Sequence, residues 1–222
     1  LANSKRNSDD VIGFYFRLFS FNWSRSINLW QHNGWTICTL NKYHQLVWFN
    51  KNMEVSTPGR ICLFGEHQDY LGLPVIAMAI SLRAKIIGEK RLDQKVIIHM
   101  PDIKRTERFD LNDTEYRKER DYFKSGIRVC KKEGLSFASG FECEISSDIP
   151  IKAGTSSSSA IVVSWINFLN QMADDPMKLT NEKIGELSFK AEVTEFSGPG
   201  GMMDQYTTAI GNLVYLESEP SI

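Results

Sequence analysis

The 222-residue sequence lacks the features that mark several large classes of protein. Its formal net charge is −1, so it has no excess of positive charge of the kind that binds nucleic acid. No stretch approaches the ~18–20 apolar residues that a membrane-spanning helix requires. The cysteines, Cys38, Cys62, Cys130 and Cys143, are widely spaced and form no C-x-x-C pair. The sequence therefore predicts a cytoplasmic protein with reduced thiols, without a disulfide framework, a zinc site, or a nucleic-acid or membrane partner.

Residues 1–52 differ in composition from the rest of the chain. They contain four of the five tryptophans and eight asparagines, but no glutamate, and we find no sustained helical or strand period in them. The apolar stretch 11–23 is interrupted by Arg17 and is followed by no clear small-residue cleavage site, so a signal peptide is not favoured. Our hypothesis is that Met53 is the natural start and that residues 1–52 are upstream sequence read in frame. The alternative is an aromatic-rich extension that packs on the domain at 53–222.

The sequence from Glu54 onward predicts an α+β fold. Strands are expected over 60–64, 75–87, 95–100, 141–145 and 212–216, with an edge strand near 107–111. Helices are expected over 116–132, after the serine run at 156–159, and over 183–194. Strands come first and helices later in an uneven order, which favours α+β over a doubly wound sheet.

A loop of small residues joins a predicted strand to a predicted helix. Residues 150–159 read PIKAGTSSSS. A helix start offers unpaired backbone N–H groups and the positive end of a dipole, which suit a phosphate. Gly154 allows close approach of the backbone to a ligand, and four consecutive hydroxyls add donors. The alternative is a serine-rich loop with an ordinary N-cap. The P-loop pattern is excluded, because no Gly-Lys-Ser/Thr ends the loop.

A second segment, residues 58–72, reads PGRICLFGEHQDYLG. It places Glu66, His67 and Asp69 directly after a predicted strand, with Arg60 just upstream. Carboxylates and an imidazole at such a turn are good partners for sugar hydroxyls. They could equally be metal ligands, although Glu-His-x-Asp lacks the helical histidine spacing of common zinc motifs. A polar turn with a satisfied histidine is the simplest alternative.

A third segment, residues 191–205, reads AEVTEFSGPGGMMDQ. A predicted helix runs into a glycine-rich turn that brings Asp204 to its far end. Glycines relieve the steric limits on a backbone that must present a carboxylate beside a ligand. Taken alone, this segment could also be an ordinary loop.

Together the three segments resemble, in order and spacing, the motifs of the GHMP kinase superfamily, and specifically of galactokinase-like sugar kinases. The family reads Pro-Gly-Arg, four residues, then Gly-Glu-His-x-Asp-Tyr, followed by Pro-x-x-x-Gly-Leu-Ser-Ser-Ser-Ala. Its third motif places a Glu twelve residues before the Asp of Met-Asp-Gln, and Glu192 and Asp204 keep this separation. The resemblance covers residue 54 to about 218. It implies an N-terminal GHMP-kinase domain, a ribosomal-protein-like α+β sandwich, with the ferredoxin-like C-terminal domain absent from this chain.

The resemblance also implies an enzyme that transfers phosphate from ATP, with Mg²⁺, to a sugar hydroxyl, most readily the anomeric hydroxyl of galactose or a related sugar. Asp204 and Arg60 are the implied catalytic residues. Glu66, His67 and Asp69 match sugar-binding positions. The implied triphosphate loop consists of Ala153, Gly154, Thr155, Ser156, Ser157 and Ser158. Ser157 and Glu192 match the Mg²⁺ ligands.

Several positions depart from the family pattern, among them Gln68, Lys152, Thr155 and Ser159. Because the sequence stops shortly after the third motif, we expect the N-terminal part of a longer protein, partnered by a C-terminal domain of the same chain. A non-catalytic sugar- and ATP-binding sensor on the same fold is an alternative function. A branch acting on mevalonate-type alcohols is a third, against which the Glu-His-x-Asp-Tyr cluster argues.

Overall fold

The computed structural model describes residues 27–32, 35–40, 46–49 and 53–217, with side chains described for 53–217. The chain divides into two compact units, Leu1–Lys51 and Asn52–Ile222, which are described separately below. The stretch 11–23, weighed above as a signal peptide, lies outside the described residues.

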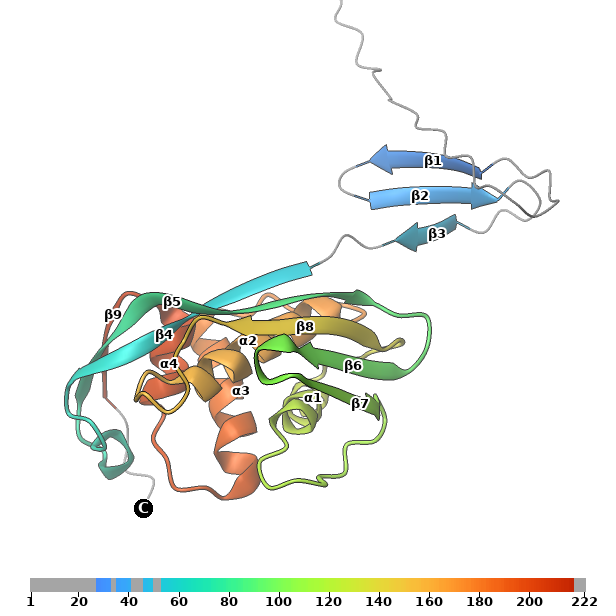
Figure 1. Cartoon of the computed structure of the whole chain (residues 1–222). Coiled ribbons are helices and arrows are strands. Elements are labelled where there is room, and N and C mark those ends of the chain that lie inside the picture. Colours follow the sequence, from blue (N-terminus) through green and yellow to red (C-terminus); the bar gives the residue numbers. More distant parts are fainter. Residues whose placement is uncertain (1–26, 33–34, 41–45, 50–52, 218–222) are drawn as a thin grey trace, which may run out of the picture. The chain divides into compact units, whose positions relative to one another are not determined.

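The first unit contains a small antiparallel sheet. Its strands are β1 (Ile27–His32), β2 (Trp35–Leu40) and β3 (Leu46–Phe49), in the order β1-β2-β3 (Figure 1). The three strands form although the sequence of this region shows no sustained strand period. The three strands are rich in aromatic and β-branched residues, which favour extended backbone even where the alternation is short.

The second unit is built on a six-stranded mixed sheet. Its strands are β4 (Met53–Phe64), β5 (Val75–Lys90), β6 (Lys95–Met100), β7 (Arg105–Asp110), β8 (Phe141–Ser147) and β9 (Leu213–Leu216). The order is β4-β5-β8-β6-β7, and β9 pairs with the first residues of β5. Only β6 and β8 run parallel among the pairs of this sheet. The long β5 therefore contacts three partners and organises the sheet.

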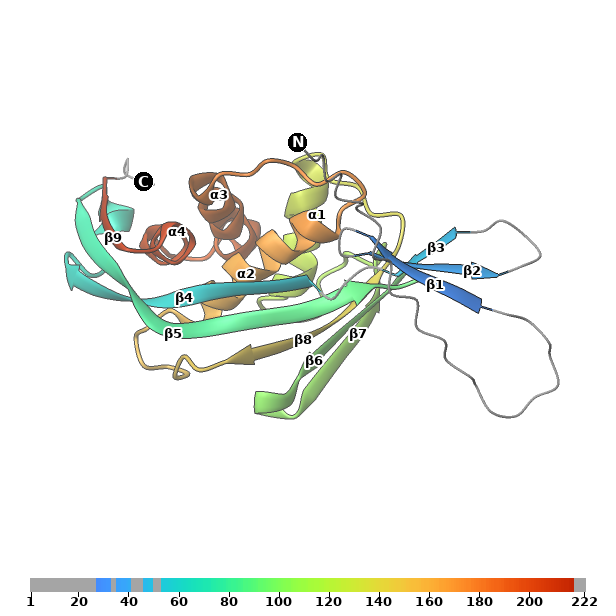
Figure 2. The ribbon, with the colours of Figure 1, turned by 90° about the horizontal axis from the view of Figure 1, so that it is seen from above.

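Four helices cover one face of this sheet (Figures 1 and 2). They are α1 (Tyr122–Lys132), α2 (Ser157–Met172), α3 (Asn181–Glu192) and α4 (Met203–Ile210). The core between the two layers is aromatic: the rings of Trp165 and Phe168 stack at 5.7 Å, and Phe141 on β8 meets both edge-on. The predicted α+β class is confirmed. Among the residues whose structure is described, no helix combines the length and hydropathy needed to cross a membrane.

Several elements differ from the sequence prediction. Strand β4 begins at Met53, because Val55 and Thr57 already alternate into the core. Helix α1 begins at Tyr122 rather than near 116, since Arg120 has a left-handed φ of 60° and the Tyr116 hydroxyl is held by Glu195 outside the helix. Helix α4 was not predicted; in its place the sequence indicated only a turn carrying Asp204.

Candidate functional site

The site centres on a pair of side chains that are 144 residues apart in the sequence. Arg60 is on β4, and Asp204 is in the first turn of α4. The Arg60 Nε and Nη2 groups both donate to Asp204 Oδ1, at 2.8 and 2.5 Å. The Arg60 side chain is 7% exposed and that of Asp204 is 31% exposed. The guanidinium is therefore fixed inside the domain, while the carboxylate reaches the surface.

Arg60 also holds the loop that precedes α2. Its Nη1 donates to the carbonyl oxygen of Gly154 at 2.7 Å, and its backbone N–H donates to that of Thr155 at 3.2 Å. One residue of the first motif thus contacts residues of both other motifs. The structure brings together three segments that the sequence separates widely.

The start of α2 is not an ordinary serine cap. Ser156 occupies the N-cap position with a left-handed φ of 56°, and its side chain makes no capping hydrogen bond. The residue is 9% exposed, and its hydroxyl has no hydrogen-bond partner among the described residues. Unpaired N–H groups in the first turn, the dipole and this buried hydroxyl together form a site that suits an anion.

A cavity of about 450 Å³ lies beside this loop. Residues 149–158 form one wall. The remaining wall is largely apolar and includes Met100, Ile103, Phe123, Ile145 and Ile161. Its volume is within the range of small-molecule sites. A molecule with a flat apolar part and an anionic part matches the two walls.

Glu192, at the end of α3, faces the same region. Gln205 Nε2 donates to Glu192 Oε2 at 2.7 Å. Burial raises the pKa of the Glu192 carboxyl, although hydrogen bonds from Gln205 and from Ser159 and Ser158 favour its charged form; the charge of Asp204 adds to the rise. Carboxylate and hydroxyl oxygens are the ligands that Mg²⁺ prefers, so this group of residues fits a magnesium ion. Ser157, the predicted ligand, lies in the same first turn and is half-buried.

The predicted sugar-binding residues differ in exposure. Asp69, in the 3-10 turn η1 (Asp69–Leu71), is 6% exposed and accepts a hydrogen bond from the backbone N–H of Met203 at 2.8 Å. Glu66 and His67 are exposed, and His67 has a left-handed φ of 62°. Asp69 is therefore bonded to α4, whereas Glu66 and His67 are accessible to solvent or to a ligand.

Sequence reasoning missed two parts of the site. The contact of Gln205 with Glu192 could have been suggested by the Met-Asp-Gln order, since Gln205 follows Asp204 in the same helical turn. The apolar cavity wall has no such signal, because its residues come from several separate segments.

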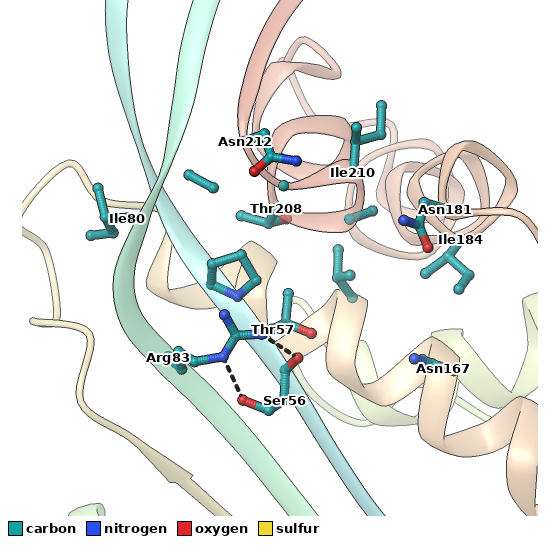
Figure 3. Close-up of a pocket in the computed structure, with 15 residues that line it drawn as sticks. Ser56, Thr57, Ile80, Arg83, Asn167, Asn181, Ile184, Thr208, Ile210 and Asn212 are labelled. Atoms are coloured by element: carbon teal, nitrogen blue, oxygen red, sulfur yellow. Dashed lines mark hydrogen bonds between the residues drawn. The ribbon is translucent and has the colours of Figure 1, made fainter.

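A second cavity, of about 490 Å³, contains none of the predicted residues (Figure 3). It lies among β4, β5 and helices α2, α3 and α4. In this cavity Arg83 donates to the hydroxyl and the carbonyl oxygen of Ser56. None of the predicted site residues therefore lines this second cavity.

Comparison with known proteins places these features in a family. Residues 121–212 match the family profile "GHMP kinases N terminal domain", and residues 48–90 match "Galactokinase galactose-binding signature". The chain is 30% identical to a galactokinase of Pasteurella multocida over 168 residues, 74% of this chain and 43% of that protein. It is 31% identical to a mevalonate kinase of Pyrococcus furiosus over 172 residues, 73% of this chain and 51% of that protein.

A solved structure shows the same relation. The crystal structure of Lactococcus lactis galactokinase complexed with galactose matches with a TM-score of 0.66 and 26% identity, over 75% of this chain and 45% of that one. The chain spans about half the length of the curated relatives it matches. The two family profiles, the shared fold and these relatives agree: the chain belongs to the GHMP kinase superfamily and carries its N-terminal domain with the galactokinase galactose-binding signature.

Proposed function

We propose that the protein transfers the γ-phosphoryl group of ATP to the anomeric hydroxyl of galactose or a closely related sugar. The observation that carries this proposal is the position of Arg60, whose side chain bonds both the Asp204 carboxylate and the carbonyl of Gly154. In phosphoryl transfer, catalysis is largely positioning and charge neutralisation. A cation that bonds both a carboxylate and the loop at a helix start is suited to that task.

The loop at 153–158 and the adjoining cavity are assigned to ATP. The unpaired N–H groups at the start of α2 and the buried Ser156 hydroxyl would bind phosphate oxygens, and the apolar wall would take the base. Glu192 and the serines beside it would hold Mg²⁺. A magnesium ion held there would neutralise part of the charge on the phosphates.

Asp204 is assigned to the acceptor hydroxyl. Both hydrogen bonds from Arg60 end on its Oδ1, so Oδ2 is the oxygen assigned to receive the hydroxyl proton. The sugar oxygen then forms a bond to the γ-phosphorus, and the bond from that phosphorus to the β–γ bridging oxygen breaks. The products are the sugar phosphate and ADP. Glu66, His67 and Asp69 are assigned to the other sugar hydroxyls.

Mevalonate is the second candidate acceptor, because mevalonate kinases match this chain as well as galactokinases do. The galactose-binding signature at 48–90 favours the sugar. The two acceptors differ in chemistry: galactose offers a ring of hydroxyls to Glu66 and His67, whereas mevalonate is an open-chain carboxylate. An acidic Glu66 repels that carboxylate, which again favours the sugar.

An ADP-release assay of the full-length protein tests the proposal. The panel contains galactose, glucose, N-acetylgalactosamine and mevalonate, with 1-deoxygalactose as the matched control that lacks only the anomeric hydroxyl. We expect release with galactose or a near relative and none with 1-deoxygalactose. Release with 1-deoxygalactose would exclude the anomeric position, and release with mevalonate alone would replace the sugar as the acceptor. Binding of galactose and ATP without release of ADP would identify a sensor.

A further inference from the structure

Asp69 contacts the helix that carries the proposed catalytic carboxylate. Its Oδ2 accepts the backbone N–H of Met203, the first residue of α4, at 2.8 Å. The N-cap residue of α4, Met202, makes no capping hydrogen bond with its own side chain. A carboxylate from another part of the chain therefore takes the place of the cap, and its charge is favourable at a helix N-terminus.

The glycine at position 201 makes room for this contact. A Cβ built on Gly201 would lie 1.8 Å from Asp69 Oδ2 and 1.9 Å from its Cγ, so the carboxyl group occupies the space that any other residue's side chain would need. The neighbouring Gly200 has no such constraint, because a Cβ there would meet only Val193, at 3.5 Å. The backbone therefore approaches the Asp69 carboxylate closely at Gly201 but not at Gly200.

The η1 turn holds Asp69 in place. The Gln68 N–H donates to Gly65 O, and the N–H groups of Leu71 and Leu73 both donate to Gln68 O. The Asp69 carbonyl accepts the N–H of Gly72, whose φ is 74°. These backbone hydrogen bonds fix the position of the main chain from which the Asp69 carboxylate extends.

We infer that Asp69 is a positioning residue, which sets the orientation of Asp204 by anchoring the first turn of α4 through the Met203 N–H. This inference rests on the proposed function, in which Asp69 also faces the sugar. Asp204 is the next residue after Met203, so a shift of the anchored amide moves the reactive carboxylate. An error of about 1 Å in the position of a reacting group can lower a rate by about 10²-fold. Occupation of the sugar site is thereby linked to the placement of the proton acceptor.

Amide hydrogen exchange of the Met203 N–H tests the anchor without any need for activity. In the full-length protein, Asp69→Ala is expected to speed this exchange by tenfold or more. Asp69→Asn, whose Oδ1 can still accept the hydrogen bond, is expected to keep it slow. Equal exchange in the wild type and in Asp69→Ala would overturn the inference, whether or not the protein is a sugar kinase.

The two glycines supply a matched kinetic test. Gly201→Ala displaces the Asp69 carboxylate and is expected to lower kcat for the sugar by ten- to a hundredfold, with the KM for ATP within twofold of the wild type. Gly200→Ala is expected to leave kcat within twofold. A Gly201→Ala variant that changes only the KM for the sugar would show that Asp69 binds substrate without positioning Asp204. Should Gly201→Ala not fold, the comparison of kcat between Asp69→Asn and Asp69→Ala decides the same question, with the larger loss expected for alanine. A wild-type protein without kinase activity would refute the proposed function, and the exchange rates would then decide on the anchor.

Discussion

Replacing Arg60 by methionine removes the side chain on which the three motifs converge. Methionine keeps much of the unbranched apolar stem of arginine but has no donor. The change deletes two hydrogen bonds to Asp204 and one to the Gly154 carbonyl. The backbone bond to Thr155 remains, because it uses the main-chain N–H of residue 60.

The expected loss of stability follows from the burial of the two partners. Hydrogen bonds to charged groups contribute about 1.5–3 kcal/mol each, but the two on Asp204 share one oxygen and are not additive. Breaking a fully buried pair costs about 3–5 kcal/mol. The Asp204 side chain is 31% exposed and can be rehydrated in the variant. We therefore expect Arg60→Met to lower the free energy of unfolding by an amount near the lower limit of this range, ~3 kcal/mol. With a urea m-value of about 2 kcal/mol/M, the unfolding midpoint should fall by about 1.5 M.

Arg83→Met is the matched control. Arg83 lies on the neighbouring strand, and among the described residues its side chain donates hydrogen bonds only to Ser56. Arg83→Met should lower the free energy of unfolding by ~1 kcal/mol and leave the rate of ADP release unchanged. Arg60→Met should in addition lower kcat by about 10²-fold or more, the usual scale for removing a group that stabilises transition-state charge.

Urea unfolding and the ADP-release assay measure both effects on the same pair of variants. If Arg60→Met and Arg83→Met lose equal stability, the convergence on Arg60 does not hold the domain together. If Arg60→Met retains wild-type turnover, the guanidinium has no part in the reaction, and the assignment of this region as the active site is refuted.

Three further predictions concern other parts of the chain. Asp204→Asn should reduce kcat by about 10²-fold or more, because the amide cannot receive the proton of the acceptor hydroxyl; near-normal turnover would remove Asp204 from the mechanism. Burial, together with the hydrogen bond to Glu195, raises the pKa of Tyr116 to about 12. The neutral Tyr116 hydroxyl therefore makes its full contribution to the free energy of unfolding below pH 10, and this contribution is lost as the pH rises towards 12. After allowance for solvent screening, we expect the loss to be about 1 kcal/mol. Tyr116→Phe should flatten this part of the urea-unfolding pH profile, and an unchanged slope would contradict the assignment. A protein that starts at Met53 should unfold at the same urea concentration as the 222-residue chain, and a large loss of stability would favour an extension that packs on the domain.

Local sequence patterns indicate the segments that carry the candidate site and several of the strands. The serine run and the Glu-His-x-Asp segment can be read directly from the sequence. The choice of Arg60 and Asp204, and the significance of the spacing between Glu192 and Asp204, rest on the resemblance of these segments to the GHMP kinase motifs. The strands predicted at 95–100 and 212–216 also follow from local apolar patterning, and the structure has them at Lys95–Met100 and Leu213–Leu216. These features can be predicted because their cause lies within a few neighbouring residues.

The features that the sequence did not predict, helix α4 and the start of α1, depend on contacts between distant segments. Helix α4 is short and contains two threonines, so its propensity is weak; the hydrogen bond from Met203 to Asp69 helps to define its start. The residues before Tyr122 are charged and have a helical pattern in the sequence, but Tyr116 is held by Glu195, far along the chain. Local periodicity identifies neither Asp69 as the partner of Met203 nor Glu195 as the partner of Tyr116.

The position of β9 bears on how the domain assembles. This strand pairs with the first residues of β5, which precede it by most of the second unit, while β4 and β5 are neighbours in the chain. During synthesis the β4–β5 hairpin can form early, but the edge that β9 covers stays open until residue 216 has left the ribosome. Late closure of a non-local pairing slows folding and leaves a strand edge exposed to other chains in the meantime.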